Sequence, residues 1–536
     1  MLHRARSINL MITLAACTVL CASVRAEDPL ELKTMAWNIW HGGREDGEKT
    51  GPQRVVEIIR DSGADIVAMQ ETYGSGEWIS EQLGFHFHPR GTNVSIHSRF
   101  PVVEDISVHE AFQCVGAVLE LPDKRKIAFY SIWLPYSKEI WEEGTRNTDD
   151  PDSMRAACEA SRASLEKIWE AIQKRLSDPA YNDMPIIIAG DFNSMSHLDY
   201  ISPFKDQYDG VVIDWPTSRI MANAGFIDSW REVHPEVNRR RDRTWTPRFP
   251  KQEQDRIDYI YYRGADLNAI DARIIDERTP SFPSDHAAIV TDFSYFRPTA
   301  GPAVRVGTYN IKHGLGNDDR LDLRRAGALL KNLRLDVIGL QEMDQQVRRS
   351  NGVDQPTALS KQLDMHSAFG SFMDYQGGQY GLAILSKYPI LESKEIRLPD
   401  GNEPRVALAC KIQLPNDQVI VAVNLHFDWV RDDQFRFAQA KVLKQYLATL
   451  KDPYLLMGDF NDTPESRTLS LLSQNTCPAK KPTDDGFTFS SIKPTKEIDF
   501  IFAAPQQAWK LQHCRVVDAP ITSDHRPVIA TYRLKQ

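Results

Sequence analysis

Apolar runs that end abruptly at a glycine recur along the chain and set its organisation. The clearest are residues 186–189 and 454–457, each followed by the sequence Gly-Asp-Phe-Asn. Consecutive apolar residues over this length predict a strand buried on both faces, and the glycine predicts its end. Each strand would then present a carboxylate and a carboxamide side by side. One copy is ordinary turn chemistry, but two copies within the same order of polar positions favour a site.

Strand-like and helix-like segments alternate in the same order in both halves of the chain. In the first half, strand patterns at residues 32–40 and 65–69 flank a helix pattern at 52–62, whose apolar positions lie on one side. Strand, helix and strand in this order predict a layered α/β architecture. The same order returns after residue 304, so we predict a duplicated domain and not a solenoid, whose repeats are far shorter.

The domain boundaries are predicted from a breaker-rich segment, Arg-Pro-Thr-Ala-Gly-Pro, near the middle of the chain. We expect a first domain at residues 27–297, a linker at 298–303 and a second domain at 304–536. Residues 135–156 form a polar insertion without periodicity, which predicts a loop over one pole of the first domain. A further helix is expected at 162–176.

Length and charge narrow the class of protein. A chain of 536 residues is too long for one ordinary core and suits two domains. Its 42% hydrophobic and 26% charged residues are typical of a soluble globular protein. The net charge of −9 excludes a global positive field that would attract nucleic acid. It does not exclude a nuclease, because a bound divalent cation supplies positive charge locally.

Residues 1–26 have the pattern of a secretory signal. Two arginines precede an apolar stretch, residues 8–22, that is too short to span a bilayer, and the small-residue sequence Val-Arg-Ala ends the segment. We therefore expect a secreted or periplasmic protein. The alternative is a lipid-anchored protein cut before Cys17, but the apolar residues that continue past this cysteine argue against it. No other stretch predicts a membrane helix.

The cysteines predict neither a zinc site nor a disulfide framework. Five remain after the signal segment, an odd number, and their spacing matches no zinc pattern. One disulfide in an oxidising compartment stays open, with Cys477 and Cys514 favoured because they share a domain. The other interpretation is five buried thiols.

Polar residues in the second half follow apolar strands, and strand ends that meet at one pole form a site. These residues are Asn310, Glu342, His426, Asp459, Asn461, Asp499, Asp524 and His525. Carboxylates and amides with few sulfurs make an oxygen-rich environment that suits Mg²⁺ or Mn²⁺ and suits structural zinc poorly. The chemistry this predicts is attack of water on phosphorus beside one or two hard cations.

In this order the motifs resemble the endonuclease/exonuclease/phosphatase superfamily, which has the deoxyribonuclease I-like fold. The motifs are Asn-Ile-x-His-Gly, Gln-Glu, Gly-Asp-Phe-Asn, Ile-Asp-Tyr/Phe-Ile and Ser-Asp-His, and they occur twice. The resemblance implies an α/β fold of two tandem four-layer α/β/β/α sandwiches, each with a site at one pole. It also implies a metal-dependent phosphoester hydrolase that acts on nucleic acid, a phospholipid head group, or a sugar or inositol phosphate. It implies no protein partner.

The resemblance assigns roles in the second domain residue by residue. Glu342 would be the principal metal ligand, beside Asn310 and Asp524. Asp459 would orient or deprotonate the water, with Asn461 on the phosphate. His525 would contact a phosphate oxygen, with its tautomer fixed by Asp499. His426 could protonate the leaving oxygen, and Arg405 is a candidate phosphate contact. Taken singly, these residues also suit structural roles such as a strand-end cap, a core histidine or a solvated charge.

The first domain repeats most of this set and departs from it at one position. The matching residues are Asn38, Glu71 and Asp285 as metal ligands, and Asp191, Asn193, Asp258 and His286 as catalytic residues. Trp133 stands where His426 should have its counterpart, and an indole cannot carry a proton to a leaving group, although it can stack on an apolar or sugar moiety. Either Tyr136 or His41 serves as the acid, or the domain is slower or only binds. We favour an active domain with a different specificity.

Residues 239–243 read Arg-Arg-Arg-Asp-Arg and are a second difference between the halves, because the matching stretch of the second half carries no such charge. Arg243 and its neighbours could bind a phosphate-rich substrate, or they could form a solvated loop. The alternative function that we keep open is a first domain that binds ligand without catalysis beside a catalytic second domain.

Overall fold

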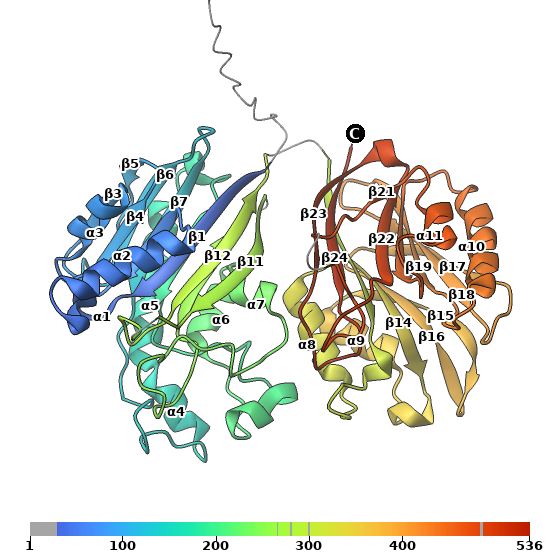
Figure 1. The fold of residues 1–536 in the computed structure, drawn as a ribbon, viewed down its shortest axis with the longest axis horizontal. Helices are drawn as coiled ribbons and strands as arrows, with labels where there is room; N and C mark the ends of the chain where they lie inside the picture. Colours follow the sequence, from blue (N-terminus) through green and yellow to red (C-terminus); the bar gives the residue numbers. More distant parts are fainter. Residues whose placement is uncertain (1–28, 265, 279–280, 298–300, 483–485, 536) are drawn as a thin grey trace, which may run out of the picture.

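The computed structural model of the chain describes residues 29–264, 266–278, 281–297, 301–482 and 486–535. The expected signal segment at residues 1–26 and half of the expected linker, residues 298–300, therefore lie outside the described residues. Four six-stranded sheets form two pairs, and each pair belongs to one half of the chain (Figure 1). The expected fold of two tandem four-layer sandwiches is confirmed.

The first domain contains two sheets that pack face to face. The strand order of the first sheet is β11 (Leu267–Ile275), β12 (Ala288–Tyr295), β1 (Leu30–Asn38), β2 (Ile66–Gln70), β4 (Val94–Ser98) and β3 (His86–Arg90). The second is β5 (Val102–Asp105), β6 (Cys114–Glu120), β7 (Lys126–Trp133), β8 (Ile186–Asp191), β10 (Asp258–Arg263) and β9 (Ile227–Asp228).

The second domain repeats this arrangement. One sheet has the order β15 (His366–Tyr375), β16 (Gly378–Ser386), β14 (Val337–Gln345), β13 (Ala303–Asn310), β24 (Val528–Leu534) and β23 (Trp509–Val516). The other has the order β17 (Ile390–Arg397), β18 (Val406–Gln413), β19 (Val419–His426), β20 (Tyr454–Asp459), β22 (Asp499–Ala504) and β21 (Cys477–Pro478).

Helices cover the outer face of each sheet because the central strands are apolar on both sides. In β8, Ile187 and Ala189 face the core between the sheets, whereas Ile186 and Ile188 face the helical layer, as the period of two requires. The covering helices are α2 (Thr50–Ser62), α3 (Gly76–Leu83), α5 (Glu159–Arg175), α6 (Pro216–Asn223), α8 (Leu323–Leu333), α9 (Gln355–Leu363), α10 (Gln434–Leu447) and α11 (Arg467–Leu472).

Two expectations about local structure need correction. The insertion at residues 135–156 is not loop throughout, because α4 (Pro151–Ala157) begins within it and the Asp150 side chain accepts a hydrogen bond from the Ser153 amide of its first turn. The five cysteines within the described residues are free thiols, so Cys477 and Cys514 form no disulfide here. Among the described residues, no helix combines the length and the apolar character needed to cross a bilayer.

The two domains meet through charged side chains. The guanidinium of Arg515, on β23, donates to the carbonyl oxygens of Val233 and Glu232, next to the short helix α7 (Ser229–Val233). The carboxylate of Glu232 also lies 2.7 Å from Nη1 of Arg305, on β13. Helix α7 therefore faces the second domain, and α8 lies opposite it (Figure 1).

Candidate active sites

The carboxyl ends of parallel strands meet at one pole in each domain and present the predicted polar residues. In the first domain, β7 and β8 run parallel and pair Trp133 with Asp191. In the second domain, β19 and β20 are parallel and pair His426 with Asp459. Trp133 therefore occupies the place of His426, as the sequence comparison of the two halves predicted.

The glycine before the last residue of β8 and of β20 is required by the backbone. Gly190 has φ of 147° and Gly458 has φ of 154°. A Cβ added to either would lie about 2 Å from a carbonyl oxygen of the neighbouring strand, 2.0 Å from Ile132 and 2.2 Å from Leu425. The two strands can thus approach closely only where the side chain is a hydrogen.

Non-glycine residues in the left-handed region mark the same pole in both domains. Glu71 and Glu342 have φ of 55° and 57°, and Asn193 and Asn461 have φ of 44° and 50°. Residues other than glycine adopt this region at a cost and do so most often where the surrounding structure holds them for a function. The agreement between two independent copies indicates that the orientation of these side chains matters.

Asn310 connects the two predicted functions of the second site, metal binding and water activation. Its amide nitrogen Nδ2 donates to Oε1 of Glu342 at 3.0 Å and to Oδ2 of Asp459 at 3.1 Å. Asp459 is only 1% exposed, and its other oxygen accepts from the Asn461 backbone at 2.9 Å. The carboxylates of Glu342 and Asp459 are therefore held at fixed positions on either side of one amide.

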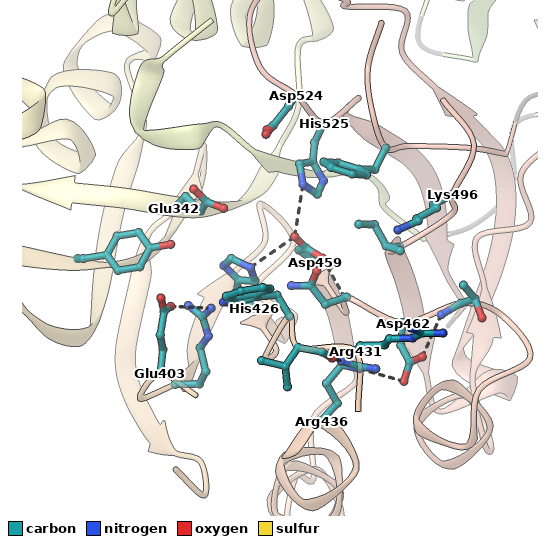
Figure 2. Close-up of a pocket in the computed structure, with 18 residues that line it drawn as sticks. Glu342, Glu403, His426, Arg431, Arg436, Asp459, Asp462, Lys496, Asp524 and His525 are labelled. Carbon is teal, nitrogen blue, oxygen red and sulfur yellow. Dashed lines mark hydrogen bonds and ion pairs between the residues drawn. The ribbon is translucent and has the colours of Figure 1, made fainter. Parts of the chain in front are cut away.

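His525 is fixed by a second buried carboxylate. Its Nδ1 lies 3.0 Å from Oδ2 of Asp499, which leaves Nε2 to face Asp459 Oδ2 at 3.6 Å. His426 approaches the same oxygen from the neighbouring strand, with its Nε2 at 3.5 Å. Two imidazoles and one carboxylate oxygen thus converge on one point of the site (Figure 2).

Burial and charge separate the protonation states of these groups. Burial disfavours the charge on His525, but Asp499 and Asp459 outweigh it and raise the pKa of His525 to about 10. Burial raises the pKa of Asp459 to about 7, with His525 opposing the rise and Asp499 adding to it. Burial, Arg405 and His525 together lower the pKa of His426 well below its usual value. His525 is therefore an imidazolium at neutral pH and His426 a neutral imidazole.

The predicted metal ligands fit a hard cation. Burial raises the pKa of Glu342, and the nearby charge of Asp524 adds to the rise. Lys312 reaches Asp524 with Nζ 3.3 Å from Oδ2. A divalent cation bound between these carboxylates would favour the charged form of Glu342. A second grouping that could hold a metal, Asp459 with Asp499 and His525, is less suitable because the histidine already bonds to a carboxylate.

The first domain reproduces this geometry. Nδ2 of Asn38 donates to Glu71 Oε1 at 3.2 Å and to Asp191 Oδ2 at 3.1 Å. His286 Nδ1 lies 3.0 Å from Asp258 Oδ2. Burial raises the pKa of Asp191 to about 7 and that of Asp285 to about 6, where Glu71 adds to the rise. The pKa of His286 is well above its usual value, because Asp258 and Asp191 outweigh burial.

The cavity of the second domain is large, and side chains of both charges line it, with Arg405 paired to Glu403 and Arg436 to Asp462. It has a volume of about 880 Å³ and contains Glu342, Asp459, Asp524 and both histidines (Figure 2). Four cationic side chains line it: Arg405, Arg431, Arg436 and Lys496. Arg405 is 1% exposed, and its Nε and Nη1 have no hydrogen-bond partner among the described residues. This arrangement supports the expected contact of Arg405 with phosphate.

The cavity of the first domain is small and aromatic. Its volume is about 180 Å³, and five aromatic side chains line it: Trp40, Trp133, Tyr136, Trp141 and Trp245. Its polar side includes Glu71, Asp191, Asp285 and His286, and among the described residues neither lysine nor arginine lines it. His41, an alternative acid, lies at this cavity with Nδ1 2.7 Å from Oε1 of Glu45.

Arg243 does not line either cavity, so its expected contact with substrate stays a prediction. Its guanidinium points to Asp276, with Nη2 3.8 Å from Oδ2. Its neighbours are also occupied: Arg239 pairs with Asp209 and Glu253, and Arg241 donates to the Glu236 carbonyl. Arg239 and Arg241 therefore help to hold the segment in place, whereas Arg240 is exposed.

Several wall residues were not predicted from the sequence. In the second domain these are Tyr380, Trp429, Arg431, Arg436, Phe489 and Lys496, and in the first they are Trp40, Trp141 and Trp245. Trp40 sits inside the Asn-Ile-x-His-Gly motif, and Trp245 lies at the end of the arginine run. Their nearness to these segments was the available signal.

Comparisons with known proteins agree with the duplication. A family model described as the endonuclease/exonuclease/phosphatase family matches residues 35–286 and again 307–525. The uncharacterized protein F14F9.5 of Caenorhabditis elegans is 26% identical over 299 residues, which cover 49% of this chain and 91% of that protein. The uncharacterized protein YbhP of Escherichia coli is 35% identical over 99 residues, 18% of this chain and 38% of YbhP.

Solved structures match one half of the chain. An endonuclease/exonuclease/phosphatase from Bacteroides vulgatus is 23% identical, with a TM-score of 0.38, and the match covers 44% of this chain and all of that one.

Proposed function

The chain belongs to the endonuclease/exonuclease/phosphatase family, and from that premise we propose that it is a phosphoester hydrolase dependent on Mg²⁺ or Mn²⁺. One observation carries the proposal. In both domains a buried aspartate at a strand end lies between an asparagine that also contacts a glutamate and a histidine held by a second aspartate. This constellation suits the attack of water on phosphorus.

In the second domain, Glu342 and Asp524 would hold the cation, and Asn310, whose Nδ2 donates to Glu342 and whose Oδ1 accepts from the Lys312 amide, would position Glu342. When bound, the cation supplies positive charge to a phosphate oxygen and to the attacking water. Asp459 takes the proton of that water, which a pKa of about 7 permits near neutral pH. The imidazolium of His525 donates from Nε2 to a phosphate oxygen as negative charge develops, and Asp499 keeps it in place. Arg405 offers its unpaired guanidinium nitrogens to the same phosphate.

His426 would donate a proton to the leaving oxygen once substrate is bound. In the free protein its pKa is low, because burial, Arg405 and His525 all disfavour the charged form. The negative charge of a bound phosphoester opposes the effect of the two cations and favours protonation. The acid role therefore belongs to the complex with substrate.

We expect His426→Ala to slow esters with poor leaving groups by about 10²-fold, the lower end of general acid–base contributions. Esters that release p-nitrophenolate should be slowed much less, because this leaving group departs without a proton. The kinetics of phenyl and p-nitrophenyl diesters would be compared in a chain whose first site is silenced by Asp191→Asn. Equal losses on both esters would contradict the acid role.

The first domain would act on a different substrate. Its cavity is small and aromatic, whereas that of the second domain is large and is lined by four cationic side chains beside five carboxylates. An aromatic wall suits a substrate with a planar or sugar moiety and one phosphate, whereas several guanidinium groups suit a substrate with more than one anionic group. Trp133 also favours a second candidate, a first domain that binds such a ligand without hydrolysing it.

Silencing each site in the full chain tests the proposal. Asp191→Asn leaves the second site alone and Asp459→Asn leaves the first, and each variant would be tested on bis-(p-nitrophenyl) phosphate, plasmid DNA, sphingomyelin and inositol phosphates. We expect hydrolysis that EDTA abolishes and Mg²⁺ or Mn²⁺ restores. Activity that persists in EDTA would reject the metal-dependent mechanism. A ligand bound but not turned over by the Asp459→Asn chain would favour the binding role of the first domain.

We also propose that the chain is exported, on the sequence pattern of residues 1–26 alone. The mass of the protein recovered from the periplasm or medium should correspond to cleavage after Ala26. A mass that includes the segment would contradict this.

A further inference from the structure

The segment that carries Asp524 and His525 touches the first domain. It connects β23, which ends at Val516, to β24, which begins at Val528. Within the second domain the segment is held by Asn317, whose Nδ2 donates to the carbonyl oxygens of Pro520 and Ser523 at 2.7 Å and 3.0 Å. The opposite side of the segment faces the first domain, where the buried side chain of Glu236 contacts it and Arg241 Nη1 lies 3.5 Å from Asp518 Oδ2.

The carboxylate of Glu236 accepts hydrogen bonds from three donors of this segment. The Ile521 amide donates to Oε1 at 3.1 Å, and the Thr522 amide and hydroxyl donate to Oε2 at 2.8 Å and 2.7 Å. Glu236 is 1% exposed. Charge-assisted hydrogen bonds in a dry interface are stronger than neutral ones and fix position as well as adding energy. The metal ligand Asp524 follows only two residues after Thr522.

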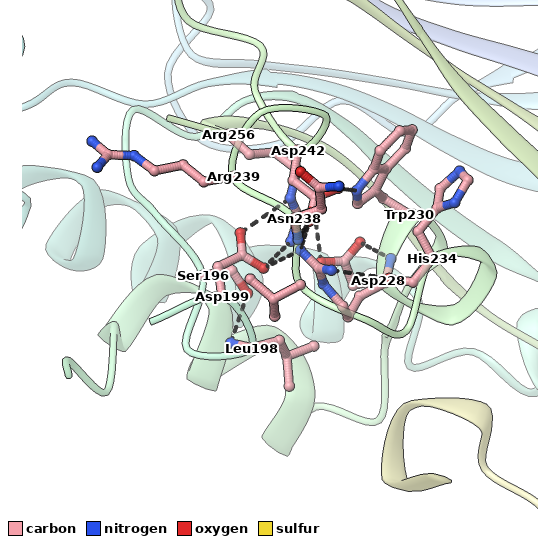
Figure 3. Close-up of polar contacts among 12 residues, drawn as sticks. Ser196, Leu198, Asp199, Asp228, Trp230, His234, Asn238, Arg239, Asp242 and Arg256 are labelled. Atoms are coloured by element: carbon pink, nitrogen blue, oxygen red, sulfur yellow. Dashed lines mark hydrogen bonds and ion pairs between the residues drawn. The ribbon is translucent and has the colours of Figure 1, made fainter. Parts of the chain in front are cut away.

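Glu236 is itself held rigidly. Its carbonyl oxygen accepts from Arg231 Nη1 at 3.1 Å and from Arg241 Nη2 at 2.8 Å. Arg231 is fully buried, and its Nη2 donates to Asp199 and Asp242, each at 2.8 Å. Figure 3 shows the network of aspartates around this point, which anchors the segment that carries Glu236. The anchor of the second site is thus connected to the core of the first domain.

The matching segment of the first domain has its anchor within the same domain. Ser281 bonds to Asp46 and Arg54 of the first domain, at 3.2 Å and 3.3 Å. Arg248 donates to the Phe282 carbonyl at 3.2 Å and pairs with Asp46. The segment before Ser-Asp-His is therefore held differently in the two copies. In the second copy, part of its support comes from the first domain.

We infer that Glu236 is a positioning residue for the second active site: through Ile521 and Thr522, the first domain sets the placement of Asp524 and His525. The inference rests on the proposed function only for its effect on hydrolysis. Residues that orient a metal ligand typically contribute 10- to 100-fold to metal affinity or activity. Glu236→Gln keeps the volume and one acceptor oxygen but turns an NH₂ group toward donors, so it should disturb this segment without opening a cavity.

The test uses the full chain with the first site silenced by Glu71→Gln and Asp191→Asn. In this background we expect Glu236→Gln to weaken binding of Mn²⁺ alone, followed by electron paramagnetic resonance, by about 10- to 100-fold. Amide exchange at residues 521–525 should be faster, and kcat should fall with little change in KM. Thr522→Val, which removes one donor, should change each quantity in the same direction by less. Asp266→Asn, which removes the interdomain pair with Arg533, is the control and should leave all three unchanged.

The outcomes separate the two proposals. If Glu236→Gln binds Mn²⁺ and exchanges its amides as the parent does, the positioning role is wrong whatever the activity. If the parent hydrolyses no phosphoester, the proposed function fails, but the binding and exchange measurements still test Glu236. Losses of equal size in Asp266→Asn would show a general weakening of the interface and would also overturn the inference.

Discussion

Asp459→Asn should lower kcat of the second domain by about 10³-fold, within the range of general-base contributions. Asp459 is buried at the point where Asn310, His426 and His525 converge, and its burial raises its pKa toward the range in which it can accept a proton. An amide fits the same space but accepts no proton from water. Steady-state kinetics on a diester, with Asp191→Asn silencing the first site, measure the loss.

A matched substitution separates chemistry from stability. Asp433→Asn removes a surface carboxylate paired with Arg467 in the same domain and should leave kcat unchanged, because exposed pairs contribute little. If Asp459→Asn keeps more than a tenth of the parent kcat, the assignment of Asp459 as the base is wrong.

Arg231→Ala should destabilise the first domain by about 3–5 kcal/mol, the usual loss when one partner of a buried ion pair is removed. The guanidinium lies between Asp199 and Asp242, both buried, and the substitution leaves both carboxylates without that partner. The transition assigned to the first domain in urea unfolding should move to lower denaturant concentration.

Its control is Arg219→Ala, which breaks an exposed pair with Asp214 at 2.7 Å. This change should cost less than about 1 kcal/mol. If the urea unfolding midpoints of Arg231→Ala and Arg219→Ala are the same, the buried network has no structural role.

The fold could be predicted from the sequence because its determinants are local. Strands such as β8 and β20 are apolar on both faces and end one residue after a required glycine, so pattern alone identified them. Helix α4 was missed because seven residues contain too few turns to show a period, and its signal was the capping residue Asp150. Whether Cys477 and Cys514 form a disulfide could not be predicted from the sequence, since pairing depends on the distance between their strands.

The residues at the centre of each site could be predicted from the sequence, whereas most residues that line the cavity around it could not. Asn310 and Asp459 end strands that meet at one pole, so their proximity could be predicted, whereas Glu342 lies at a bulge inside β14 and not at its end. The walls come from loops whose course depends on tertiary packing, as with Trp141 and Lys496. The surroundings of the arginine run at 239–243 could not be predicted for a related reason: charge density along a sequence does not reveal which carboxylates will meet it, as Asp276 meets Arg243.

The segment that carries Asp524 and His525 is hydrogen-bonded to Glu236 of the other domain, and this makes the duplication asymmetric. A first half cut out at the linker keeps Asp46 and Arg54 and with them the support of its own pocket. A second half cut out in the same way loses Glu236. It also exposes Arg515, whose acceptors, the carbonyl oxygens of Val233 and Glu232, belong to the first half. The two copies are thus not equivalent modules: the separated first half keeps the support of its Ser-Asp-His segment, and the separated second half keeps Asn317 but loses Glu236.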